Sequence, residues 1–355
     1  MSDRGDSSSS STDNDSGDNG SSDNGSSDGD VDDLVHRADL DALVRMIDDR
    51  CSTRDWAGLL RVRDRTRHAV ETGRQLWPAA TLAEYRLALL APPDFVAAVL
   101  DESDGLSGRF TIGPLTEVAA QNHSWSELAL VLDRGPRTAF VAHERVIRGE
   151  DVGDVDLAPV LEIPTRLADW EPSYALAVYA EDGAEFPMPE PDAAAWTDGE
   201  PIAGAERLDD PDVELAVQQL VEPWTTGSNG RVDIVCVEGD HLDAIGALGV
   251  RRARVSPLRP NAAIAWVAWA GSSGGAHGRR RGAAAGRFGA WWLLAALGDA
   301  LDEWPLPPEA VGAIAESLRW YRWNAFEPSV GWTLQIAVED VAESLSWAIN
   351  ATDAT

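Results

Sequence analysis

The stretch Arg231-Val-Asp-Ile-Val-Cys-Val237 decides the fold class of this 355-residue chain, because polar and apolar side chains alternate along it. Alternation with a period of two is typical of a half-buried β-strand. The turn dipeptide Asn229-Gly230 precedes it, and residues 213–221 have the apolar spacing of a helix. From about residue 213 the chain is therefore predicted to contain a mixture of helices and strands.

The residues after this strand predict further helices and strands. We expect a strand over 252–256, a closing hairpin of 332–339 and 344–350, and helices over 241–248, 260–270, 281–297 and 309–320. Trp320 and Trp323 are three residues apart, and at helical spacing such a pair favours a core position over stacking on a base or sugar. Residues 213–355 are therefore predicted to form an α+β domain.

Residues 31–151 are predicted to form an all-α domain. Apolar residues recur there every three or four positions, Trp56 opens a helix capped by Thr53 or Asp55, and Pro78 fits the first turn of another. Short helices without an internal repeat indicate an irregular bundle or a solenoid-like array. Dense prolines over 152–212 predict an extended connector with one strand at 174–179, so the fold class as a whole is α+β.

The first 30 residues are predicted to be a disordered acidic tail. After Met1 they contain no apolar side chain and are filled mainly with Ser, Asp, Gly and Asn. No secretory signal is expected, and Cys51 and Cys236 form no C-x-x-C pair. Two distant thiols favour a reducing cytoplasm, and the apolar runs are too short to cross a bilayer. We therefore expect a cytoplasmic protein without a membrane segment.

All 29 basic residues of the chain are arginines, and they face 60 Asp and Glu, so the formal net charge is −31. The absence of lysine excludes a Walker-type phosphate loop, a Schiff-base enzyme and a protein kinase. Such an excess of acidic residues is typical of proteins from a salt-adapted (halophilic) organism, whose whole proteome is acidic, since concentrated salt screens the charge. A high-GC genome, whose codons favour Arg, Ala, Gly and Asp, is the alternative explanation.

One part of the chain interrupts this acidic pattern. Residues 244–298 contain no Asp or Glu but eight arginines, although the chain as a whole averages about one acid per six residues. Within it lies the loop Gly271-Ser-Ser-Gly-Gly-Ala-His-Gly-Arg-Arg-Arg281. Glycines let backbone N–H groups approach an anion, a following helix N-terminus adds positive potential, and arginines offer bidentate forks. The candidate anion-binding residues are Ser272, Ser273, Gly274, Gly275, His277, Arg279, Arg280, Arg281 and Arg287.

A structural interpretation of the same loop stays open. In it, the helices on either side are core helices, and their arginines pair with nearby acids such as Asp240, Asp299 or Glu303. Close contact between helices would then explain the three glycines Gly282, Gly286 and Gly289. The six histidines are scattered without metal-ligand spacing, so neither a metal nor a cofactor is expected.

The C-terminal third of the chain, from about Trp224, resembles domain-of-unknown-function family number 6183. The resemblance rests on Ser228-Asn-Gly-Arg231, Ser273-Gly-Gly-Ala-His-Gly-Arg279 through Phe288 to Trp291, Trp320-Tyr-Arg-Trp323 and Asn350-Ala-Thr-Asp353. Members of that family carry aromatic residues and fewer arginines in the Gly-rich loop, so the arginine triplet is a departure. The resemblance implies a domain boundary and no particular reaction.

The preferred hypothesis is a non-catalytic interaction or ligand-binding protein with a Gly/Arg-rich anion-binding loop. Its partner would be an anionic small molecule or an acidic protein segment. The alternative is an enzyme that acts on a nucleotide or phosphorylated substrate, with Arg279, Arg280 and Arg281 holding phosphate and His277 as general acid or base. Nucleic acid is disfavoured as a partner, because the acidic surface repels a polyanion outside the arginine-rich stretch.

Overall fold

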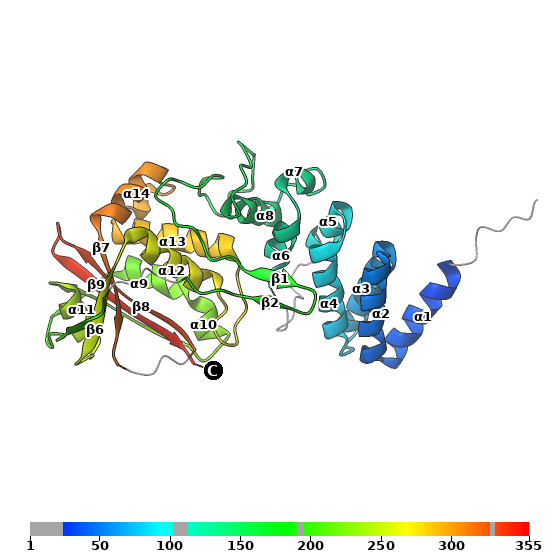
Figure 1. Ribbon diagram of the computed structural model, residues 1–355, viewed down its shortest axis with the longest axis horizontal. Coiled ribbons are helices and arrows are strands. Elements are labelled where there is room, and N and C mark those ends of the chain that lie inside the picture. Colours follow the sequence, from blue (N-terminus) through cyan, green and yellow to red (C-terminus); the bar gives the residue numbers. More distant parts are fainter. Residues whose placement is uncertain (1–23, 102–112, 190–194, 327–330, 355) are drawn as a thin grey trace, which may run out of the picture.

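The computed structural model describes residues 24–101, 113–189, 195–326 and 331–354, and it is an α+β protein (Figure 1). Its N-terminal part is a row of helices packed side by side, as the solenoid-like interpretation predicted. These helices are α1 (Asn24–Arg37), α2 (Leu40–Thr53), α3 (Trp56–Glu71), α4 (Trp77–Leu90), α5 (Pro93–Asp101), α6 (Leu115–Asn122), α7 (Trp125–Leu128) and α8 (Pro136–Ile147).

The ends of these helices follow local capping chemistry. The Asp55 carboxylate accepts a hydrogen bond from the Gly58 amide at 2.9 Å, so Asp55 and not Thr53 caps α3. The predicted tail of residues 1–30 needs a correction at its end, since α1 already begins at Asn24. Val31 is buried in the helical core, and the helix continues from it towards the N-terminus. Residues 1–23 of that predicted tail lie outside the described residues.

The connector packs on both domains. Its hairpin β1 (Val178–Ala180) and β2 (Gly183–Glu185) lies against the helical domain, where the Tyr179 amide donates to Gln121 at 2.6 Å. The short strands β3 (Thr197–Gly199) and β4 (Arg207–Leu208) pair with the sheet of the C-terminal domain. Instead of the single strand predicted at 174–179, the connector contains four short strands. β1 and β2 pair with each other, and β3 and β4 lie at the two edges of the large sheet. Because the pairing partner supplies the hydrogen bonds, these segments form strands although they are too polar to be recognised in the sequence.

The C-terminal domain is built on a seven-stranded antiparallel sheet in the order β3-β6-β7-β8-β9-β5-β4. Its longer strands are β5 (Arg231–Glu238), β6 (Ala253–Leu258), β7 (Arg319–Asn324), β8 (Trp332–Asp340) and β9 (Leu345–Asp353). Its helices are α9 (Pro211–Leu220), α10 (Glu222–Thr226), α11 (His241–Ala247), α12 (Pro260–Ser272), α13 (Ala283–Leu297), the 3-10 helix η1 (Leu301–Glu303) and α14 (Pro308–Ser317).

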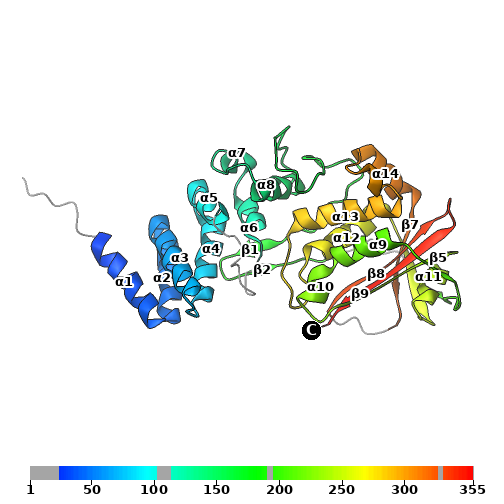
Figure 2. The same cartoon turned by 180° about the vertical axis from the view of Figure 1, so that it is seen from behind.

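Both faces of this sheet are covered (Figures 1 and 2). Helices α9, α12, α13 and α14 bury one face in the larger core, and α11 covers part of the other. The Trp320–Trp323 pair corrects the predicted helix over 309–320, because α14 ends at Ser317 and both tryptophans lie on β7. Both are buried as predicted, but on opposite faces, since residues three apart on a strand point to opposite sides. No helix in the described part of the chain is long and apolar enough to cross a membrane.

Candidate functional site

The Gly/Arg-rich loop connects α12 to α13 and ends against the helical domain. The Arg281 amide donates to the Ser272 carbonyl at 2.8 Å, which closes the loop on the end of α12. Gly282, the residue before α13, has a φ of +93°, a conformation that a side chain would strain. The loop therefore directs the N-terminus of α13 towards α6 and α8.

Arg280 binds a carboxylate of the helical domain. Its Nε and Nη2 donate to the two oxygens of Glu117 on α6, at 2.8 and 2.7 Å, in a bidentate arrangement. Glu117 is fully buried and also accepts hydrogen bonds from the Tyr179 hydroxyl at 2.6 Å and the Ala283 amide at 3.2 Å. Burial alone would raise the pKa of Glu117, but the Arg280 guanidinium outweighs it and holds this pKa below its usual value.

A second buried carboxylate completes the N-terminus of α13. Glu144 on α8 accepts a hydrogen bond from the Ala284 amide at 2.7 Å and from Arg148 at 2.7 Å. Burial and the neighbouring Glu117 raise the pKa of Glu144 to about 7. Two side-chain carboxylates from the helical domain thus lie where the free N–H groups and dipole of α13 attract negative charge.

Arg287 lies one turn further along α13 and contacts the connector instead of the loop. Its Nε and Nη2 donate to the two oxygens of Glu171, both at 2.7 Å, and both side chains are completely buried. Arg287 also donates to the carbonyl oxygens of Pro164 at 2.8 Å and Arg166 at 2.9 Å. The structure therefore separates Arg287 from the other candidate residues and places it in an ion pair that anchors the connector.

The glycine-rich half of the loop surrounds a third buried carboxylate, that of Asp353 at the end of β9. The Ala276 amide donates to Asp353 at 2.6 Å, and the Ser228 hydroxyl donates to it at 2.9 Å. A Cβ on Gly275 would lie 2.1 Å from the Asp353 carboxylate, and Gly275 has a φ of +67°, so only glycine fits. The segments around Ser228, the loop and Asp353, which carry the family resemblance, thus meet in one place.

The remaining candidate residues are partly exposed or form hydrogen bonds to neighbouring residues of the C-terminal domain. Ser273 is buried and accepts a hydrogen bond from the Trp224 indole at 2.9 Å. Arg281 donates to the Gln219 carbonyl at 2.8 Å, whereas the side chains of His277 and Arg279 are exposed. The predicted residues from Ser272 to Arg281 are therefore together, but Arg280 already holds a carboxylate of this chain.

Sequence reasoning missed the acidic side of this junction. Neither Glu117 nor Glu144 was a candidate, and the acids suggested as structural partners, such as Asp240 and Asp299, are not the ones that pair with Arg280 and Arg287. The available signal was a single acid within an otherwise apolar helical stretch, as in Leu115-Thr-Glu117-Val-Ala-Ala. In the sequence, only the family resemblance drew attention to Asp353, as part of Asn350-Ala-Thr-Asp353.

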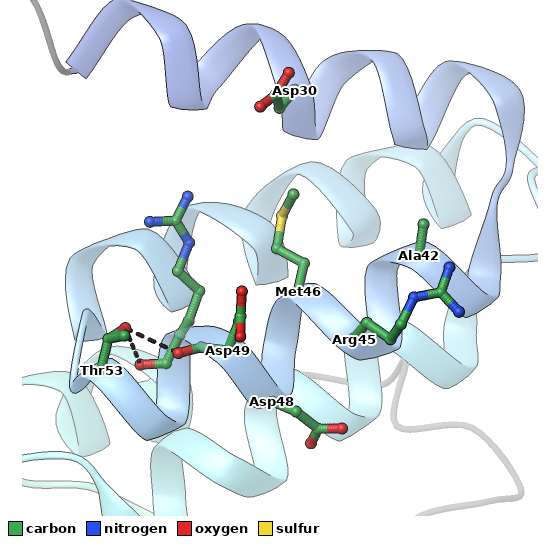
Figure 3. Close-up of a pocket in the computed structure, with 8 residues that line it drawn as sticks. Asp30, Ala42, Arg45, Met46, Asp48, Asp49 and Thr53 are labelled. Atoms are coloured by element: carbon green, nitrogen blue, oxygen red, sulfur yellow. Dashed lines mark hydrogen bonds between the residues drawn. The ribbon is translucent and has the colours of Figure 1, made fainter.

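A separate hollow lies at the far end of the helical domain. This pocket has a volume of about 820 Å³, and Figure 3 shows Asp30 on α1 across from the lining residues of α2. Its lining is of mixed charge and comprises Asp30, Ala42, Arg45, Met46, Asp48, Asp49, Arg50 and Thr53. None of these residues belongs to the loop. Within the described ranges, no group of three or more His, Cys, Asp or Glu is placed to hold a metal ion.

Comparison with known families covers both domains. A profile described as a family of unknown function, DUF6183, matches residues 41–355. The match extends from α2 to β9 and so corrects the predicted resemblance, which was confined to the C-terminal third. No curated protein and no solved structure matches the chain. The continuous match over the helical domain, the connector and the sheet shows that this chain belongs to the DUF6183 family.

Proposed function

We propose that this protein is a non-catalytic interaction protein whose Gly/Arg-rich loop binds carboxylates. In the isolated chain these carboxylates are its own, and their binding joins the helical domain to the α+β domain. The observation that carries the proposal is the bidentate contact of Arg280 with the buried Glu117, next to the α13 N-terminus. A fixed joint between a row of helices and a covered sheet suits a protein that presents surfaces to a partner.

The enzyme alternative has less support from this geometry. A phosphate clamp would need the guanidinium groups of Arg279, Arg280 and Arg281 to converge, but Arg280 is held by Glu117 and Arg281 by the Gln219 carbonyl. Among the described residues, the imidazole of His277 makes no hydrogen bond that would orient it as a general acid or base. The side chains of His277 and Arg279 are exposed, so solvent reaches this part of the loop.

A thermal-shift experiment at molar salt tests the binding part of the proposal. Phosphate, nucleotides and citrate are added to the wild type and to an Arg279→Gln/Arg281→Gln variant. We expect no change in Tm with any of these small anions, since the strongest fork in the loop is occupied. A rise in Tm with a nucleotide that disappears in the variant would refute the proposal and favour the enzyme alternative.

Limited proteolysis and small-angle scattering test the joint. Arg280→Ala is expected to increase the radius of gyration and to speed cleavage within the connector, because the Glu117 carboxylate loses its guanidinium partner. Arg134→Ala is the matched control, since Arg134 pairs with Asp156 at an exposed site and carries the same charge. Circular dichroism verifies that both variants fold. Equal scattering and cleavage in the wild type and Arg280→Ala would contradict the proposal.

A further inference from the structure

A second group of arginines lies on the sheet, away from the loop. It consists of Arg252, Arg254, Arg322, Trp196 and Phe326, which we call the arginine–aromatic surface. Trp196 directly precedes the edge strand β3, Arg254 lies on β6, and Arg322 lies on β7. These three strands are neighbours at one edge of the sheet, so the five side chains come together from three separate stretches of sequence.

The guanidinium groups of this surface rest on aromatic rings. Arg322 lies 4.5 Å and Arg254 lies 5.2 Å from the centre of the Trp196 ring. Arg252 lies 5.1 Å and Arg254 lies 5.6 Å from the centre of the Phe326 ring. Such cation–π contacts hold an arginine in place while leaving its N–H donors free to bind another group.

These three arginines differ from Arg280 and Arg287, each of which pairs with a buried carboxylate. None of Arg252, Arg254 and Arg322 forms an ion pair within 4.0 Å with any acid of the described residues. Asp198 lies directly across from Arg254 in the strand register but does not come within that distance.

Three further observations indicate that the surface is incomplete as it stands. The Trp196 and Phe326 side chains are 39% and 44% exposed, so large apolar area faces water. Phe326 has a φ of +64°, a strained conformation for an aromatic residue. The Nε of Arg322 is buried and has no hydrogen-bond partner. Each of these costs free energy in the isolated chain, and a bound partner that covers the two rings would offset the first of these costs.

We infer that the arginine–aromatic surface binds a short acidic segment of a partner protein. Asp or Glu carboxylates would take the guanidinium forks, and flanking apolar side chains would cover the Trp196 and Phe326 rings. A short segment places all its charge on the three arginines. The evenly spaced phosphates of a nucleic acid would extend onto the surrounding surface of a chain with a net charge of −31, where they are repelled. The inference deepens the proposed interaction role and concerns a different surface from the loop.

Fluorescence anisotropy tests the inference with a labelled peptide of about six residues that contains three Asp or Glu and two leucines. Arg254→Gln is expected to raise its Kd about tenfold, because one charge-assisted contact is lost. Arg231→Gln is the matched control, since Arg231 is an exposed strand arginine on β5, away from this edge of the sheet. Trp196→Ala is expected to weaken binding at high salt, where the apolar contact dominates.

Several outcomes would overturn the inference. They are no peptide binding, an unchanged Kd in Arg252→Gln/Arg254→Gln, or an equal loss in Arg231→Gln, which would indicate a non-specific charge effect. Tighter binding of a labelled single-stranded oligonucleotide that is lost in Arg254→Gln would assign the surface to nucleic acid instead. None of these results affects the proposed joint, whose test uses Arg280 and measures molecular shape.

Discussion

Replacement of Arg280 by methionine is the most informative perturbation of the domain junction. Arg280→Met keeps much of the side-chain volume but leaves the fully buried Glu117 with only the Tyr179 hydroxyl and the Ala283 amide. Removing one partner of a buried ion pair costs about 3–5 kcal/mol. A carboxylate can avoid the full penalty by taking up a proton, and at pH 7 that costs about 3.7 kcal/mol for an ordinary Glu pKa of about 4.3. We therefore expect a loss of about 3–4 kcal/mol at pH 7.

The same reasoning predicts how this loss depends on pH. In Arg280→Met, the pKa of folded Glu117 is raised above its unfolded value, so the folded state binds more protons. The contribution of Glu117 to the stability of the variant is therefore greatest at low pH and falls as pH rises. The penalty relative to wild type should shrink to about 1 kcal/mol at pH 5, where protonating Glu117 costs little. Urea unfolding followed by circular dichroism at pH 5, 6, 7 and 8 measures it.

Two controls make this prediction refutable. The Glu117→Gln/Arg280→Met double variant should cost less than the sum of its single variants by about 2 kcal/mol, because it removes the unpaired charge. Arg134→Met, at the exposed pair with Asp156, should stay within about 0.5 kcal/mol of wild type. The reasoning is wrong if Arg280→Met is as stable as wild type at pH 7, or if its penalty is the same at pH 5.

Two further predictions concern α13 and its N-terminus. Gly286→Ala should lower the free energy of unfolding by about 1–3 kcal/mol or more, because its Cβ would lie 2.1 Å from the Ala268 carbonyl on α12. Gly289→Ala is the milder control, since its Cβ would meet only the flexible end of the Leu220 side chain at 2.7 Å. Thermal melting compares the two variants. The raised pKa of Glu144, about 7, means that the folded state binds an extra proton between about pH 4.5 and 7, so its stabilising contribution is lost as pH rises through that window. Glu144→Gln should flatten this slope in a pH series of urea unfolding, and an unchanged slope would contradict the assignment.

Local patterns in the sequence predicted most of the elements. The alternation in Arg231-Val-Asp-Ile-Val-Cys-Val237 corresponds to β5, and the Asp55 cap marks the start of α3. The prediction failed where a pattern fits two structures, as for Trp320 and Trp323, whose spacing suits both a helix face and the two sides of a strand. It also failed for the connector, where short polar strands are held by pairing with β5 and β6, which local propensity does not report.

Two glycines at the start of α13, Gly282 and Gly286, have different structural roles. The expectation of close helix contact is confirmed at Gly286, whose Cα lies against α12. Gly282 has a different reason, since its positive φ turns the chain into α13 beside Glu144. The spacing of the glycines alone did not distinguish these two roles, because one depends on a neighbouring helix and the other on the local backbone.

The sequence by itself determined the charge distribution of this protein: no lysine, a net charge of −31, and an acid-free stretch in which the arginine-rich loop and Arg254 stand out. Only the tertiary structure decided what these arginines contact. Arg280 pairs with Glu117, which lies 163 residues away in the sequence, whereas Arg254 lies on aromatic rings and forms no ion pair with an acid of the described residues. The physical reason is that an ion pair depends on distance and on exclusion of water, and both are set when the helical domain and the sheet domain pack together.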